Sequence, residues 1–354
     1  MKIRIGFLDI IRAFAIFMVV ATHAIEYTNT PGVSLLMLTG IFFSSIAVPI
    51  FFFVDGYLLI RGDPSSRQNF SEAIRENAFR LLLPWTLFSL LYFATRFFFE
   101  YIGYFQTNLA YSNSLQNILK ALYFSEYSAQ LYFLPALFIV RLFAPISSAA
   151  LQLGWLASCL GLIAYMISFN TFEPTIKNFL PKTNGLDPFI HAIWGYQFYL
   201  IGILYKKHES QIDNQLTTSS VILSSITVTL IYLNTETSSK SIDMAFQISY
   251  LLLLITLIKH LNVRSEKMSL IGRNTMGIYL LHVPIIMKAT SICINKLPIS
   301  SEFVYILIVL ISLFCSLAIS ILIQKTNYLR FFFGLRKIEC PPNSHLVTKS
   351  SRMP

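Results

Sequence analysis

Apolar runs of about 20 residues, each bounded by polar or charged residues, recur along almost the whole chain. A helix that crosses a membrane needs about 20 consecutive, mostly apolar residues, because the hydrocarbon core of a bilayer is about 30 Å thick. The pattern therefore predicts an all-α, polytopic membrane protein with about ten transmembrane helices. The predicted spans are 7–26, 35–60, 80–99, 131–150, 153–170, 188–205, 220–235, 244–261, 269–289 and 303–324.

The amino-acid composition agrees with this pattern. Hydrophobic residues make up 55% of the 354 positions and charged residues only 12%, which is too little polar surface for a soluble globular protein. A secretory signal would also place Lys2 and Arg4 before an apolar run. Because Asp9 and Arg12 interrupt that run and further spans follow it, we expect a retained helix rather than a cleaved signal.

The basic residues predict the orientation. When the ten spans alternate across the membrane, most of the 27 Lys and Arg residues fall on the side of the N-terminus, and basic residues near span ends are retained in the cytoplasm. Both termini are therefore predicted to be cytoplasmic. This asymmetry and contact with anionic membrane lipid account for the net charge of +10, and the basic residues form no clustered motif of the kind that binds nucleic acid.

Little of the chain lies outside the predicted spans. We expect one transmembrane domain, 1–335, and a disordered cytoplasmic tail, 336–354, which is rich in prolines and small polar residues and has no apolar period. The longest connections are 100–130 and 171–187 on the outer side and 61–79 on the inner side. Any site must therefore be built from the helices and these loops. The four cysteines have no metal-like spacing, so neither a metal site nor a disulfide is expected.

Three ionisable side chains lie in the first predicted span, FLDIIRAFAIFMVVATHA. Asp or Arg at the centre of a membrane helix costs about 2.5–3.5 kcal/mol, so such residues mark a polar interior or a site. Arg12 and His23 are eleven positions apart, which is nearly three helical turns, so they share one face at a separation of about 16 Å along the axis. Asp9 can pair with Arg12 across one turn. A satisfied ion pair with a histidine at the interface is the structural alternative, but the shared face favours a continuous polar stripe.

Charged residues also occur near the inner ends of two later spans. Asp55 lies in VPIFFFVDGYLLIRG, and we expect it to neutralise a basic residue at similar depth, either Arg12 or Arg80. Arg75 and Arg80 lie at the inner mouth of the span that begins RENAFRLLLPW. From their spacing alone they are topological anchors, although a guanidinium is also the preferred group for bidentate phosphate binding.

Two further polar residues lie deep in apolar runs. Arg141, in QLYFLPALFIVRLFAP, is too far from either end to be an anchor, so we expect it to point into the helix bundle. His282 lies about midway along LIGRNTMGIYLLHVPII. A lone buried histidine is more often structural than catalytic, but this one is a second histidine within reach of the interior that His23 faces. His191 and His208 lie at loop junctions and are given no role.

Together, these motifs resemble the acyltransferase 3 family of integral membrane acyltransferases. The resemblance rests on Arg12 and His23 within FLDIIRAFAIFMVVATHA, followed in order by FFFVDGYLL, RLLLPW, LYFLPALF and IGRNTMGIYLLHVPII. It covers the chain from residue 7 to about residue 325. It implies transfer of an acyl group, usually acetyl from cytoplasmic acetyl-CoA, to a carbohydrate at or beyond the outer face of a bacterial inner membrane. It also implies that Arg12 and His23 are the functional pair.

The chain departs from the family pattern at two positions. Asp55 stands where relatives commonly have a serine before Gly-Tyr, so no serine hydroxyl can act there. Asn77 stands where many relatives have an arginine three residues before Arg80. This second departure weakens a paired-arginine phosphate clamp and leaves Arg80, together with Arg75, to bind the donor phosphates.

The residue pattern and the resemblance predict a consistent mechanism. The phosphates of the CoA donor need cationic partners at the inner mouth, where Arg75, Arg80 and Arg12 lie, and Arg141 is a further candidate. The thin pantetheine arm would follow a polar channel and present the thioester near His23. A neutral imidazole there could act as general base on an acceptor hydroxyl or carry the acetyl group itself. Sequence leaves both roles open.

A proton-coupled transporter is the alternative function. Buried Asp, Arg and His residues also form proton relays, and Asp9, Asp55 and His282 are candidates for one. The sequence lacks the internal repeat with matching broken helices that is typical of many transporters. We therefore expect an O-acyltransferase that acts on a polysaccharide or glycolipid, with acetyl-CoA as donor and no metal.

Overall fold

The apolar runs of the sequence are helices throughout the computed structural model. It describes residues 6–28, 35–59, 70–103, 119, 129–150, 155–179, 187–215, 217–234 and 240–336. No strand occurs among these residues, which confirms the predicted all-α class. Helices suit a bilayer because each one satisfies its backbone hydrogen bonds internally. The predicted tail and most of the connection 100–130 lie outside the described residues.

The described helices follow one another along the chain with short connections. Those of the first half are α1 (Gly6–Glu26), α2 (Leu35–Leu59), α3 (Phe70–Asn77), η1 (Ala78–Leu82), α4 (Leu83–Tyr101), η2 (Ala129–Tyr132), α6 (Phe133–Leu142), α7 (Ala144–Ala150) and α8 (Trp155–Phe179). Those of the second half are α9 (Pro188–Lys207), α10 (Glu209–Gln215), α11 (Thr218–Asn234), α12 (Lys240–His260), α13 (Glu266–Arg273), α14 (Thr275–Leu281), η3 (His282–Ile286), α15 (Met287–Ile294), α16 (Ser301–Lys325) and η4 (Arg330–Phe333).

Several described helices are long and apolar enough to cross a membrane. Five qualify by length and composition, and a sixth does so if the bent pair α10 and α11 forms one span. The five are Gly6–Glu26, Ser71–Tyr101, Ile242–His260, Thr275–Ile294 and Ser301–Lys325. These helices indicate an integral membrane protein. The total of ten crossings and the cytoplasmic termini stay predictions.

The predicted span 131–150 is broken in the structure. α6 ends before Phe143, whose φ of −84° and ψ of 3° leave the helical region, and α7 begins directly after it. Pro145 explains the break, because proline lacks a backbone N–H for the preceding turn and favours the first positions of a new helix. The apolar run therefore forms two short helices.

The predicted span 269–289 is also divided. Asn274 separates α13 from α14, and its side-chain amide donates to the carbonyl of Leu270 at 2.8 Å, which competes with continuation of the helix. Gln324 of α16 donates to the Asn274 Oδ1 at 2.9 Å, which fixes this junction against a neighbouring helix. The spanning segment is therefore Thr275–Ile294.

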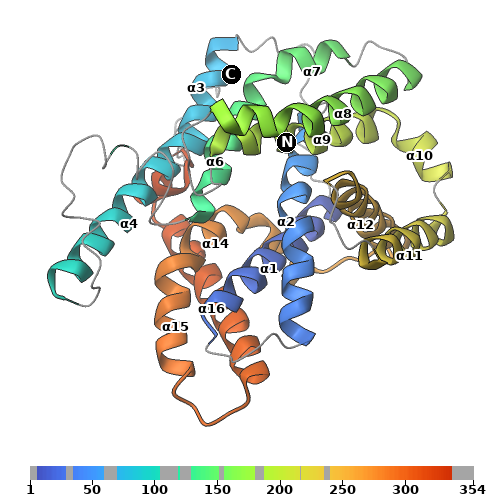
Figure 1. The fold of residues 1–354 in the computed structure, drawn as a ribbon. Coiled ribbons are helices and arrows are strands. Elements are labelled where there is room, and N and C mark those ends of the chain that lie inside the picture. The colour runs from blue at the N-terminus through green and yellow to red at the C-terminus, as the bar shows by residue number, and fades with distance from the viewer. Residues whose placement is uncertain are drawn as a thin grey trace, which may run out of the picture.

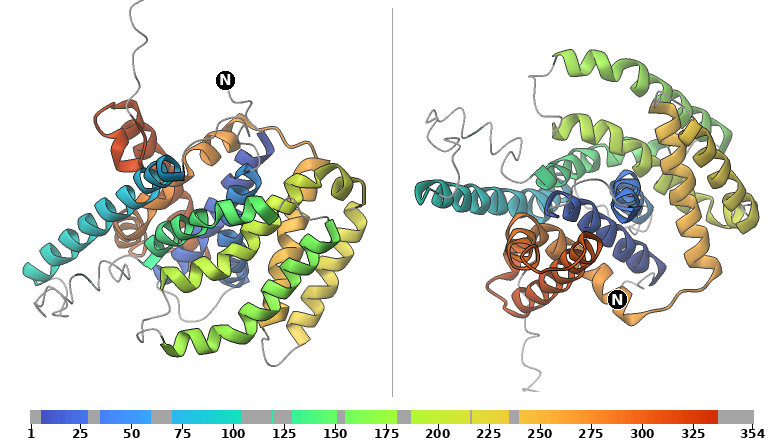
Figure 2. Two further views of the ribbon diagram at one scale, coloured as in Figure 1. Left: turned by 90° about the horizontal axis from the view of Figure 1, so that it is seen from above. Right: turned by 60° about the horizontal axis from the view of Figure 1, so that its bottom comes forward.

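α1 lies at the centre of the molecule (Figures 1 and 2). It contacts α2, α12, α13, α14 and α16, and 67% of its apolar window is buried, against 28–50% for the other four candidate spans. Glycine allows one of these contacts to be very close. A Cβ at Gly272 of α13 would lie 1.8 Å from the carbonyl oxygen of Asp9, so only glycine lets the two backbones approach in this way. The polar stripe of α1 is thus enclosed by other helices.

Candidate active site

Arg12 and His23 lie on the single uninterrupted helix α1, so the predicted shared face follows from helical geometry. Asp9 pairs with Arg12 as expected, with 3.8 Å between Asp9 Oδ1 and Arg12 Nη1. Ser269 of α13 also donates to the other carboxylate oxygen of Asp9 at 3.3 Å. The inner end of the stripe is therefore an ion pair that is anchored to a second helix.

At the other end of the stripe, His23 meets His282. The two ring centroids are 5.4 Å apart and the ring planes are inclined by 54°. His23 lies in the last turn of α1, and His282 begins η3. This contact confirms the expectation that both histidines reach the same interior.

His282 is fully buried, with an exposed fraction of 0%. Its Nδ1 atom lies 2.8 Å from the carbonyl oxygen of Tyr279 and 3.1 Å from that of Ile278. Its Nε2 atom has no hydrogen-bond partner in the part of the chain that the structure describes. One side of the ring is therefore fixed by the backbone, and the other side is available for chemistry.

The helix is interrupted immediately after His282. Val283 has non-helical angles, φ −121° and ψ 144°, and Pro284 follows, which cannot continue a regular helix. Carbonyl groups released by such a break must find donors inside a membrane. Gln130 Nε2 donates to the Val283 carbonyl, and the Tyr92 hydroxyl donates to the Leu280 carbonyl.

Gln130 and Tyr92 were not predicted from the sequence. Neither residue belongs to a charged or histidine motif, but Pro284 inside an apolar span was a usable signal. It indicates a backbone break whose carbonyls need side-chain donors from other helices. Gln130 is held in turn, because the Tyr279 hydroxyl donates to its backbone carbonyl. These contacts fix η2 and α4 against the turn that carries His282.

Arg141 points into the bundle, as predicted, and its three nitrogens all donate hydrogen bonds. Nε and Nη2 donate to the two carboxylate oxygens of Asp55, the first at 2.9 Å, and Nη1 donates to Asn77 Oδ1 at 2.9 Å. The expected partner of Asp55, Arg12 or Arg80, is therefore wrong. The flat guanidinium fork of Arg141 matches the carboxylate geometry, and α6 brings it to that position from another part of the sequence.

The two departures from the family pattern meet at this one side chain. Asp55 supplies the carboxylate that binds Arg141, and Asn77 supplies a neutral acceptor. An arginine at position 77 could not replace this contact, because a guanidinium has no acceptor atom. The structure thus explains the two departures together, as parts of one hydrogen-bonded cluster that joins α2, α3 and α6.

Arg75 and Arg80 remain on the surface. Arg75 is exposed, and the side chain of Arg80 is 56% exposed, with a 3.9 Å ion pair to Glu76. Gly334, which follows η4 with a φ of +62°, packs against the Arg80 backbone: a Cβ there would lie 2.7 Å from the Arg80 carbonyl oxygen. The backbone that carries Arg80 is therefore supported, while its guanidinium is accessible to an anion.

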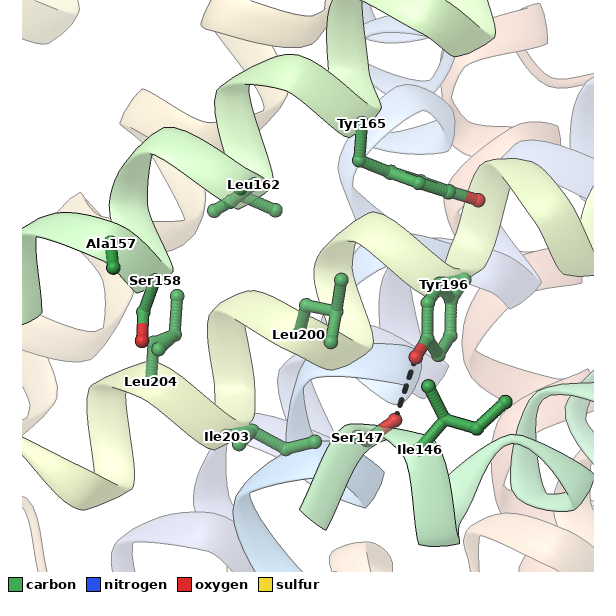
Figure 3. A pocket seen from close by; sticks show the side chains of 11 residues that line it. Ile146, Ser147, Ala157, Ser158, Leu162, Tyr165, Tyr196, Leu200, Ile203 and Leu204 are labelled. Atoms are coloured by element: carbon green, nitrogen blue, oxygen red, sulfur yellow. Dashed lines mark hydrogen bonds between the residues drawn. The ribbon is translucent and has the colours of Figure 1, made fainter. Parts of the chain in front are cut away.

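An apolar cavity of about 230 Å³ lies elsewhere, between α7, α8 and α9 (Figure 3). The Ser147 and Tyr196 hydroxyls, 2.8 Å apart, hydrogen-bond at one side of it. Leu162 and Leu200 line the remainder with other apolar side chains. It contains none of the candidate site residues, so we do not assign it to the reaction.

Comparison with protein families identifies the chain. The family model for acyltransferase 3, described as "Acyltransferase domain", matches residues 5–325, which include α1 with its polar stripe, the Arg141 cluster and the turn at His282. No curated protein and no solved structure gives a significant match. Because the family model covers nearly the whole chain, this protein belongs to the acyltransferase 3 family of membrane acyltransferases.

Proposed function

We propose that this protein is a membrane O-acyltransferase that moves acetyl from cytoplasmic acetyl-CoA to a hydroxyl of a cell-surface polysaccharide or glycolipid, such as O-antigen or an exopolysaccharide. We place it in a bacterial inner membrane. The observation that supports this most strongly is the contact between His23 and His282 in the interior of a chain from an acyltransferase family. Imidazole rings are the usual groups for proton transfer and acyl transfer near neutral pH.

The charged residues support a division of labour along the molecule. The exposed guanidinium groups of Arg75 and Arg80 are available for the donor phosphates, and Arg12 continues this cationic path along α1 toward His23. Arg141 is neutralised by Asp55, so its pull on a phosphate is weak. We therefore propose that Arg141 supports the donor site indirectly, by fixing α3 and the arginines that follow on it.

Acetyl transfer in isolated membranes tests the proposed function. Membranes that contain the protein are given labelled acetyl-CoA and crude glycan from cells that lack it. The expected product is glycan that carries label in an alkali-labile ester. His23→Gln should lower the rate by on the order of 10²- to 10⁴-fold, the usual contribution of an acid–base group. Membranes that yield no labelled glycan above an empty-vector control would contradict the proposal.

The same membranes also test the transporter alternative. The family match supports a transferase and gives no support to a transporter. Counterflow of a solute that depends on the protein, without any acetylation, would reverse this conclusion. Acetylated glycan without counterflow is the expected result.

A further inference from the structure

The hydrogen bonds of His282 fix which ring nitrogen carries the proton. Nδ1 faces the carbonyl oxygens of Tyr279 and Ile278, and carbonyl oxygens can only accept hydrogen bonds. Nδ1 is therefore protonated. Because the ring is fully buried, the neutral form is favoured over the charged form. Nε2 then carries a lone pair, and this is the atom that can take up a proton.

The lone pair of Nε2 has no donor in the described part of the protein. Buried polar atoms are nearly always hydrogen-bonded, so an exception in a native structure calls for a ligand or a chemical role. The ring of His23 lies beside it. A base whose Nδ1–H is held by the backbone and whose Nε2 is unpaired has the arrangement that general-base catalysis requires.

A second unpaired acceptor occurs at the same turn. Gln130 turns its amide nitrogen to the Val283 carbonyl, which fixes Oε1 as the other amide atom, and this oxygen is buried without a partner among the described residues. Val283 is the neighbour of His282 in the chain. Two unpaired acceptors, Nε2 of His282 and Oε1 of Gln130, favour a ligand that brings hydrogen-bond donors, and hydroxyl groups have this property.

We propose that His282 is a second catalytic residue, whose Nε2 accepts the proton of the acceptor hydroxyl during acyl transfer. This inference rests on the proposed function. As the hydroxyl oxygen attacks the thioester carbonyl, its O–H bond breaks and a C–O bond forms, and the C–S bond to CoA then breaks. The proton passes from Nε2 to the departing thiolate. The products are an O-acyl ester and free CoA thiol, with the neutral imidazole restored.

His282→Asn tests this role, because asparagine can still donate an N–H to the carbonyls of Tyr279 and Ile278 but has no atom at the place of Nε2. We expect kcat to fall by on the order of 10²- to 10⁴-fold, with an unchanged KM for acetyl-CoA and an unchanged Tm. His191→Asn is the matched control. The Nδ1 of His191 also lies 2.8 Å from a carbonyl four residues earlier, that of Asp187, and this variant should keep wild-type kcat.

A spectroscopic measurement tests the inference without enzyme turnover. Nitrogen-15 NMR of the histidine rings in the full-length protein in nanodiscs, with His282→Asn used to assign the signal, reports which nitrogen carries the proton. We expect Nδ1 of His282 to be protonated and Nε2 to be bare. The opposite tautomer would overturn the proposal.

The outcomes separate this inference from the proposed function. If wild-type protein transfers acetyl and His282→Asn retains kcat within about threefold, well below the usual contribution of a general base, the inference is wrong. It is also wrong if the loss of rate follows the loss of folded protein, as a purely structural role requires. If wild-type protein transfers no acetyl group, the proposed function itself fails.

Discussion

Arg141 illustrates how far the role of a residue depends on its neighbours in space. Its depth in an apolar run correctly predicted that it points inward, because a membrane helix does not expose a guanidinium to lipid. Its partners could not be predicted, since Asp55 and Asn77 lie on α2 and α3. The same holds for His23 and His282: helical period placed His23 on the face of Arg12, but only the tertiary fold shows that the two histidine rings meet.

Removing the charge of Arg141 should destabilise the protein. Arg141→Leu leaves the carboxylate of Asp55, whose side chain is only 14% exposed, without its bidentate partner. Breaking a buried pair in this way costs on the order of 3 kcal/mol, so we expect a lower Tm and a lower yield. The double variant Arg141→Leu, Asp55→Leu should recover most of the loss. A Tm equal to that of the wild type in the single variant would contradict this account of the cluster.

Conservative changes at the exposed arginine should affect donor binding. Arg80→Lys keeps the charge but loses the bidentate fork, and the loss of one charge-assisted hydrogen bond of about 1.5 kcal/mol predicts a KM for acetyl-CoA raised about tenfold. We expect kcat to change little. Initial rates measured across a range of acetyl-CoA concentrations separate the two constants. An unaltered KM would remove Arg80 from the donor site.

The helical elements were largely predictable, while their interruptions were less so. Runs of apolar residues located helices at all the predicted spans, because length and hydrophobicity are properties of the local sequence. The break at Pro145 and the junction at Asn274 divided two of these runs. Both carry local signals, a proline and a side chain that competes for backbone hydrogen bonds, but hydropathy averaged over a span conceals them.

The close contact between α13 and α1 gives a prediction at this scale. Gly272→Ala would place a Cβ against the Asp9 carbonyl and force the two backbones apart near the ion pair of Asp9 and Arg12. Overpacking of this kind costs about 1–3 kcal/mol, so Tm should fall. Gly161→Ala in α8 is the matched control, because a Cβ there meets nothing within 4 Å. Equal Tm values for the two variants would show that the contact can relax.

The whole molecule places its most buried candidate span, α1, where the proposed reaction must occur. The helices around it are shared between the two halves of the sequence (Figure 2), so the site cannot form from either half alone. Composition predicted a membrane protein because it measures the total polar surface. It could not predict which helices surround α1, since that depends on packing between distant segments.

Orientation can be measured directly. The distribution of basic residues predicts that both termini face the cytoplasm. Single cysteines introduced at Lys2 and Ser350 in a variant that lacks the native cysteines should react with a membrane-impermeant maleimide in inverted vesicles but not in intact cells. Labelling of either position in intact cells would contradict the predicted orientation, and with it the cytoplasmic entry of the donor.

The central claim is that His23 performs the chemistry of acyl transfer inside the helix bundle. Single-turnover acetyl transfer by purified protein in proteoliposomes, together with equilibrium binding of acetyl-CoA, tests it most directly. His23→Gln should bind acetyl-CoA with nearly unchanged affinity and transfer acetyl at least about 100-fold more slowly, the pattern of a group that acts chiefly in the transition state. Transfer by this variant at a rate close to that of the wild type would contradict the account.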